Sequence, residues 1–422
     1  MNTTRSGLSR RALLASGGAL SLTALLAACT SNSPSGSKTS AASNQKLTLW
    51  MDSAFTASMT KTVSGFSSKY GVNLAVQPKD FGTILANYLQ AAPAGSGPDL
   101  LDVNIDFIGP ITNAKLAQQL NFGSKLDSLD KRAITGYTVD GKQYGLPLAV
   151  EATNVWRNTK LVSDPVETWD DLAKVGADLK AKGVKYPILI DNNAYMWQGA
   201  MTAFGGYVFK ENSDGSYDPQ DVGVDNAGSV AAFQWLADAV KGGYTNYVGA
   251  TDNSGLDVGG AGDAWKANQV GIHISGPWML DTYKKLGNFA IDAIPAGPAG
   301  PAKSWLSARG LIANAESKNA ALAATFITDY LAAAGPMTTW AKATSKLSAW
   351  VPVQDSAADS TTKAFGDASK NAHAIPQNAE LAGYWTPATD ALLLIQQGKS
   401  TPKKAADNLG AAFRKSIKQS GK

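Results

Sequence analysis

Lys46-Leu-Thr-Leu-Trp-Met-Asp52 decides the fold, because its apolar and polar residues alternate with the period of a strand. The segments that follow have the patterns of a helix over 56–69, a strand over 72–77, a helix over 84–92 and a strand over 100–103. Strands that alternate with helices predict an α/β fold with a mostly parallel sheet and helices on both faces.

A second set of α/β segments lies further along the chain. Strand patterns occupy 186–190 and 269–274, and helical patterns occupy 194–204, 230–240, 320–334, 390–397 and 402–417. The part of the chain from Lys46 onward has about 375 residues, more than one hydrophobic core usually serves. We therefore expect two domains.

The N-terminal residues have the composition of an export signal. Residues 1–11 contain Arg5, Arg10 and Arg11 and no acidic residue, and the apolar run over 12–28 is shorter than a bilayer span. Residues 1–28 are therefore expected to be a signal peptide. Ser9-Arg10-Arg11 resembles a twin-arginine signal, and export by the general secretory route stays open.

Leu26-Ala27-Ala28-Cys29 resembles the lipobox of bacterial lipoproteins, which implies that Cys29 carries a diacylglycerol anchor. Cys29 is the one cysteine of the chain, so no disulfide can form within it, and an unpaired exported thiol needs an explanation. The stretch over 30–45 is rich in Ser, Thr, Asn and Gly. Residues 29–45 are therefore predicted to be a flexible tether.

Composition argues against several functions. The formal net charge is +4, and the three arginines of the signal peptide account for 3 of these charges, which leaves +1 for the rest. We therefore expect no nucleic-acid partner, since such a partner needs a concentrated basic patch. With only His273, His373 and one cysteine, a metal site or a Cys/His catalytic pair is not expected.

Short segments along most of the chain resemble, in family order, the extracellular sugar-binding proteins of bacterial ABC importers, and the maltodextrin-binding proteins most closely. The segments that carry the resemblance are 46–50, Gly97-Pro98-Asp99, 144–151, 168–172, 179–183, 205–210, 221–228, Gly276-Pro277-Trp278, Ile375-Pro376-Gln377 and Tyr384-Trp385.

This resemblance implies a periplasmic-binding-protein-like α/β fold with two discontinuous lobes, a hinge and a ligand cleft. We expect lobe 1 to contain 46–149 and 300–347, and lobe 2 to contain 150–299 and 348–422. The resemblance also implies a monomeric binding protein without cofactor or enzymatic activity. Its partners would be an oligosaccharide, the transmembrane subunits of an ABC permease and, through the lipid anchor, the outer face of the cell membrane.

Two carboxylates are candidates for binding sugar hydroxyls, since carboxylates accept strong hydrogen bonds. Glu151 matches a hydroxyl acceptor of the family, with a surface carboxylate of the hinge as the alternative. Asp106 follows the strand over 100–103, at the edge of the sheet where ligands bind in open α/β sheets. The alternative for Asp106 is to cap the helix expected near Ile108.

Aromatic side chains are expected to stack on the apolar faces of sugar rings. Trp278 and Trp385 match stacking residues of the family, and Tyr384 is an alternative to Trp385. Tyr195 is a third candidate, but a different register would place Trp197 in the cleft instead, and the sequence leaves this open.

Other positions depart from the family pattern. Ala54-Phe55 replaces an Asp-Lys pair, and Val103, Phe107 and Thr389 replace a Trp and two Arg. We expect Asp52, Phe55, Phe81 and Arg309 to replace the lost contacts, with a surface charge as the alternative for Arg309. A maltodextrin-like ligand is favoured, while the particular sugar stays open.

Two other functions fit the same residues. An exported carbohydrate-active enzyme also places carboxylates and tryptophans in a cleft, and it needs two carboxyl groups on either side of the scissile bond. A lipoprotein that senses a ligand for a signalling receptor would have the same sequence features.

Overall fold

The computed structural model describes residues 45–190, 193–213, 215–245, 260–344, 346–357 and 359–420. The expected signal peptide, the lipidation site Cys29 and the tether up to residue 44 lie outside the described residues. All described residues belong to one compact unit.

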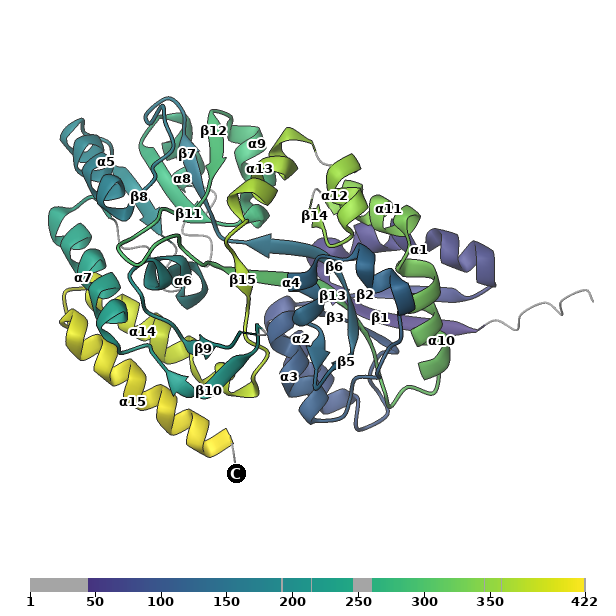
Figure 1. Ribbon diagram of the computed structural model, residues 1–422. Coiled ribbons are helices and arrows are strands. Elements are labelled where there is room, and N and C mark those ends of the chain that lie inside the picture. The colour runs from purple at the N-terminus through teal and green to yellow at the C-terminus, as the bar shows by residue number, and fades with distance from the viewer. Residues whose placement is uncertain are drawn as a thin grey trace, which may run out of the picture. The chain divides into compact units, whose positions relative to one another are not determined.

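The larger sheet has the strand order β14-β6-β13-β3-β1-β2, and β15 pairs with β13. Its strands are β1 Lys46–Asp52, β2 Asn73–Lys79, β3 Leu100–Asn104, β6 Gly145–Ala152, β13 Trp305–Ala313, β14 Leu347–Ser348 and β15 His373–Ala374. β1 is parallel to β2 and β3, whereas β13 is antiparallel to β3 and β6. The predicted parallel unit at the start of the chain is thus present (Figure 1).

Helices and short strands connect these elements. They are η1 Ser53–Phe55, α1 Thr56–Tyr70, α2 Phe81–Ala91, α3 Ile105–Asn113, η2 Gly123–Ser128, α4 Lys131–Thr135, β4 Thr138–Val139 and β5 Lys142–Gln143. Gly71 ends α1 in the left-handed region, at φ 67°, where glycine has no steric penalty. β1 buries Leu47, Leu49 and Met51 completely, as its alternating pattern predicts.

The smaller sheet has the order β12-β7-β11-β8. Its strands are β7 Asn154–Asn158, β8 Tyr186–Ile190, β11 Val270–Ser275 and β12 Phe289–Asp292. The elements around it are α5 Trp169–Ala181, α6 Ala194–Ala203, β9 Phe209–Glu211, β10 Tyr217–Val222, α7 Ala227–Gly242, α8 Gly260–Lys266, η3 Pro277–Met279 and α9 Leu280–Leu286. Only β8 and β11 are parallel to each other.

The chain passes between the two sheets several times. β6 of the larger sheet ends at Ala152 and β7 of the smaller sheet begins at Asn154. The chain returns between β12 and β13, through the Pro- and Gly-rich stretch over 294–301. The last elements are α12 Val351–Ala357, α13 Ser360–Ala368, η5 Ala379–Gly383, α14 Trp385–Gln396 and α15 Pro402–Ser420.

Two helix predictions need correction. The helix predicted over 320–334 is α10 Ala320–Thr325 followed by a π-helical turn over Phe326–Leu331, and a new helix, α11 Ala334–Thr344, follows. Pro336 explains the break, because its ring would clash with the carbonyl of Ala332 in a continuous helix. α14 starts at Trp385 rather than at Asp390, since Pro387 is accepted within a first helical turn.

Candidate functional site

A pocket of about 860 Å³ is lined by side chains from strands of the larger sheet and from α6 and η3, which follow β8 and β11 of the smaller sheet. β1, β3 and β13 contribute polar residues near the ends where β1 and β3 finish, which is where open α/β sheets bind ligands. All nine residues that the sequence singled out for ligand contact line this pocket: Asp52, Phe55, Phe81, Asp106, Glu151, Tyr195, Trp278, Arg309 and Trp385. The structure therefore brings together side chains that are up to 333 positions apart in the sequence.

Arg309 lies in the wall of the pocket between two carboxylates and two aromatic rings. Its guanidinium forms ion pairs with Asp102 at 2.5 Å and with Asp52 at 3.2 Å. Its Cζ lies 4.5 Å from the ring centroid of Phe55 and 4.4 Å from that of Phe81. Only 6% of Arg309 is exposed, so the alternative of a surface charge is wrong.

The charges around Arg309 depend on one another. Burial raises the pKa of the Asp102 carboxyl, and the charge of Arg309 opposes this shift. Burial acts to lower the pKa of Arg309, but Asp102, Glu151 and Asp52 outweigh it and raise the pKa. Arg309 is therefore a fixed cation, held by neighbouring acids and covered by the rings on its flat faces.

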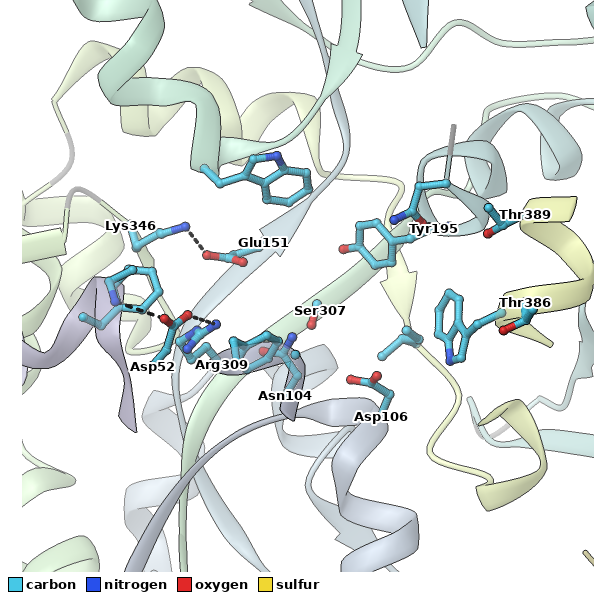
Figure 2. A pocket seen from close by; sticks show the side chains of 18 of the residues that line it. Asp52, Asn104, Asp106, Glu151, Tyr195, Ser307, Arg309, Lys346, Thr386 and Thr389 are labelled. Carbon is cyan, nitrogen blue, oxygen red and sulfur yellow. Dashed lines mark hydrogen bonds and ion pairs between the residues drawn. The ribbon is translucent and has the colours of Figure 1, made fainter. Parts of the chain in front are cut away.

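Glu151, near the end of β6, forms an ion pair with Lys346, just before β14. Figure 2 shows the two side chains pointing toward each other, beside Asp52 and Arg309. Burial acts to raise the pKa of Glu151, but Lys346 and Arg309 reverse the shift and hold the pKa below its ordinary value. Glu151 is thus an ionised hydrogen-bond acceptor inside the pocket rather than a surface carboxylate.

Asp106 lies in the first turn of α3, where it lines the pocket. The N-cap of α3 is Asn104, so the alternative that Asp106 is the cap of this helix is wrong. Burial raises the pKa of the Asp106 carboxyl to about 6. Among the described residues no cation forms an ion pair with it, and a hydrogen bond from its own backbone N–H opposes the shift only in part.

Three aromatic residues of the pocket come from helical elements, Tyr195 from α6, Trp278 from η3 and Trp385 from α14. Trp278, on η3, is 37% exposed, which is high for a large apolar side chain of this protein. The Tyr195 ring lies 6.3 Å from that of Trp278, and its hydroxyl donates to the carbonyl of Trp305. Trp385 packs edge-on against Trp305 at 5.3 Å.

The structure decides two alternatives that the sequence left open. Trp197 is 3% exposed and stacks on Phe233 in the core, so Tyr195 is the residue of this segment in the pocket. Tyr384 is 1% exposed, and Trp385 lines the pocket instead.

Sequence reasoning missed several residues of the pocket. They are Ala54, Gly82, Asn104, Asn193, Ser307, Lys346, Ile375, Thr386 and Asp390. Some of them lie in segments that carry the family resemblance, for example Ile375 in Ile375-Pro376-Gln377. Lys346 lies in a connection without any motif, so no local signal identifies it. Thr389, noted as a departure from the family pattern, lines the pocket as well.

Two further properties concern the described residues only. They contain no group of three or more His, Cys, Asp or Glu side chains that could hold a metal ion. Among the helices of the described ranges, none is both long and apolar enough to cross a membrane.

The two-lobed fold and its polar and aromatic pocket define a class of ligand-binding proteins. Residues 61–377 match the family described as bacterial extracellular solute-binding protein, and the chain belongs to this family. The family predicted from the sequence is thereby confirmed.

Individual proteins with similar sequences are known from bacteria. The chain is 29% identical over 405 residues to the galactooligosaccharide-binding protein of Bacillus subtilis, covering 93% of this chain and 94% of that protein. It is 25% identical over 419 residues to the maltooligosaccharide ABC transporter solute-binding lipoprotein of Streptococcus pneumoniae, covering 94% of each.

A solved structure has the same fold. It is that of a cyclo/maltodextrin-binding protein complexed with maltotetraose, with a TM-score of 0.77 and 23% identity, and the match covers 90% of this chain and 98% of that one. This likeness confirms the predicted periplasmic-binding-protein-like fold.

Proposed function

We propose that this protein captures an oligosaccharide for a bacterial ABC importer. The observation that carries the proposal is the composition of the pocket, where ionised acceptors such as Glu151 lie near the exposed ring of Trp278. A sugar has a rim of hydroxyls that donate to carboxylates and apolar ring faces that stack on aromatic rings. The full-length similarity to a galactooligosaccharide-binding and a maltooligosaccharide-binding protein supports the same ligand class.

We place 46–149 and 300–347 in lobe 1, and 150–299 and 348–422 in lobe 2. The strands β1, β2 and β3 lie in one sheet and β7, β8 and β11 in the other, which supports this division for these strands. The bounds themselves fall within β6 and β14 of the larger sheet, and β15 of that sheet lies in the range given to lobe 2. A sugar that contacts both lobes favours the closed arrangement over the open one, because it gains its full set of contacts only there. The closed, monomeric protein would then deliver the sugar to the transmembrane subunits of the permease.

The protein would act outside the cell membrane, attached through a diacylglycerol group on Cys29. Membership in an extracellular family and similarity to a solute-binding lipoprotein support export and anchoring. In this role the protein makes and breaks no bond.

A thermal-shift panel tests the ligand class. It compares maltose to maltoheptaose, galacto-, cello- and xylo-oligosaccharides and trehalose with amino acids and peptides as controls. A ligand at 100 times its dissociation constant adds about 2.7 kcal/mol of apparent stability. Stabilisation by one sugar series and by none of the controls is expected. Stabilisation by peptides or amino acids alone would overturn the proposal, and release of reducing sugar would favour the enzyme instead.

A further inference from the structure

Lys346 is a pocket residue whose role the family resemblance does not supply. Its side chain is 8% exposed and that of its partner Glu151 is 12% exposed, so both charges are withdrawn from bulk water while they line the pocket. The ammonium also lies 5.3 Å from the ring centroid of Phe55, which covers one side of it. A lysine held in this way has little freedom to move away from the carboxylate.

The ion pair leaves hydrogen-bonding capacity on both partners. An ammonium has three donors, and Lys346 uses one of them on Oε1 of Glu151. Among the described residues none donates to Oε2 of Glu151, and none accepts a second hydrogen bond from Lys346. A donor and an acceptor on two ion-paired side chains therefore line the pocket together.

We propose that Lys346 is a specificity-determining residue which, together with Glu151, recognises two adjacent hydroxyls of one sugar unit. One hydroxyl donates to Oε2 of Glu151, and its neighbour accepts from the ammonium of Lys346. A carboxylate alone accepts from any hydroxyl, whereas the pair requires a donor and an acceptor at a fixed separation. This inference rests on the proposed sugar-binding function and specifies how the same pocket selects its ligand.

The chemistry of sugars fits this arrangement. Each hydroxyl both donates and accepts, so two neighbours can satisfy the two roles simultaneously. Gauche hydroxyls on adjacent ring carbons have oxygens about one hydrogen-bond length apart, so both can face the two neighbouring side chains at once. A unit whose adjacent hydroxyls are both axial and opposed, or one that lacks either hydroxyl, cannot bridge the pair.

The test compares Lys346→Met with Lys303→Met, because Lys303 is also ion-paired to a glutamate but is 51% exposed and does not line the pocket. Calorimetric titration uses maltotriose and galactotriose. We expect Lys346→Met to weaken the affinity for the trisaccharide that binds by about tenfold or more, the usual effect of losing a hydrogen bond to a charged group. Lys303→Met should leave the affinity unchanged.

Mono-deoxy analogues of that trisaccharide separate recognition from a structural effect. In the wild type, removal of one of the two hydroxyls should weaken binding, and in Lys346→Met the removal of the hydroxyl that accepts from Lys346 should have no further effect. An equal loss for the parent sugar and for every analogue would overturn the inference, since it would indicate a merely structural lysine.

The double variant Glu151→Gln with Lys346→Met carries no buried charge at this position, so it keeps the test valid if Lys346→Met folds poorly. In this double variant, removal of the hydroxyl that accepts from Lys346 should again have no further effect, because its donor is absent. A double variant that still binds this analogue more weakly than the parent sugar would overturn the inference alone. Failure of the wild type to bind any sugar would overturn both the inference and the proposed function.

Discussion

Asp106 is the pocket carboxylate whose charge depends most directly on pH near neutrality. Burial raises the pKa of its carboxyl to about 6, and the ionised form is the stronger acceptor for a sugar hydroxyl. We therefore expect the sugar affinity of the wild type to fall as the pH falls through about 6. Titrations across this range measure the effect. An Asp106→Asn variant that keeps the same pH dependence would contradict this role.

The same pKa shift predicts how stability depends on pH. Because the pKa is raised, Asp106 of the native state is still protonated at pH values between the ordinary pKa of an aspartate and about 6. In the unfolded chain the same carboxyl has already lost its proton in this pH range. The contribution of Asp106 to the free energy of unfolding is then greatest at low pH and decreases as the pH rises through this window. Above it, Asp106→Asn should stabilise the sugar-free protein by about 1–3 kcal/mol in denaturant unfolding. A destabilised variant at pH about 8 would refute this explanation.

Trp278 and Trp169 provide a matched pair of tryptophans. Trp278 is 37% exposed in the pocket, whereas Trp169 is 1% exposed in the core. Trp278→Ala should weaken sugar binding by about 1–3 kcal/mol with little loss of stability, because it removes a ring from the site and not from the core. Trp169→Ala should instead destabilise the fold by about 3–5 kcal/mol. Unchanged sugar affinity in Trp278→Ala would show that this ring does not contact the ligand.

Single pocket residues could be predicted from the sequence where they lie in or beside a recognisable motif. Glu151, Trp278 and Trp385 follow short segments with a family resemblance, and they line the pocket. Lys346 and Asp102 were not recognised as partners of pocket residues, because an ion pair between positions 195 or 207 apart leaves no local trace in one sequence. Burial and pKa shifts also arise only when distant elements pack.

At the scale of elements, the segment after β15 is pressed against α3. A Cβ atom on Gly109 of α3 would overlap the carbonyl oxygen of Gln377, and the side chain of Gln377 donates to the carbonyl of Thr135. Ile375 in this segment lines the pocket. The close approach of this segment therefore fixes one wall of the site.

Gly109→Ala tests the importance of this contact. The added methyl group must displace the segment over 375–378, which should cost about 1–3 kcal/mol of stability and weaken sugar binding. Gly335→Ala is the control, since no atom lies within 4 Å of its added Cβ and alanine is the better helix former in α11. Thermal unfolding measures both variants. Equal stability of Gly109→Ala and the wild type would show that the segment yields freely.

Elements with a clear period were predictable from the sequence, and those that depend on packing were less so. β1 and α1 follow from alternation, helical spacing and the glycine stop at Gly71. The π-helical turn over Phe326–Leu331 was not predicted, because its residues have the pattern of an ordinary helix. Its Tyr330 donates to the carbonyl of Thr62 on α1, a contact between distant segments.

At the scale of the whole molecule, the first 44 residues are expected to determine location rather than ligand. If Cys29 carries the lipid, Cys29→Ala should move the protein from the membrane fraction to the soluble exported fraction, since the anchor is lost. The variant should bind sugar like the wild type, because Cys29 precedes every described residue. Fractionation and immunoblotting measure the distribution. A Cys29→Ala protein that remains in the membrane fraction would contradict lipid anchoring at this residue.

The central claim is that the pocket binds an oligosaccharide and releases it unchanged. Calorimetric titration of the purified protein with maltotriose and galactotriose, followed by chromatography of the recovered sugar, tests it most directly. We expect saturable one-to-one binding of at least one of the two sugars, weaker binding of that sugar by Trp278→Ala, and recovery of intact trisaccharide. Absence of binding to both sugars, or recovery of shorter products, would contradict the account.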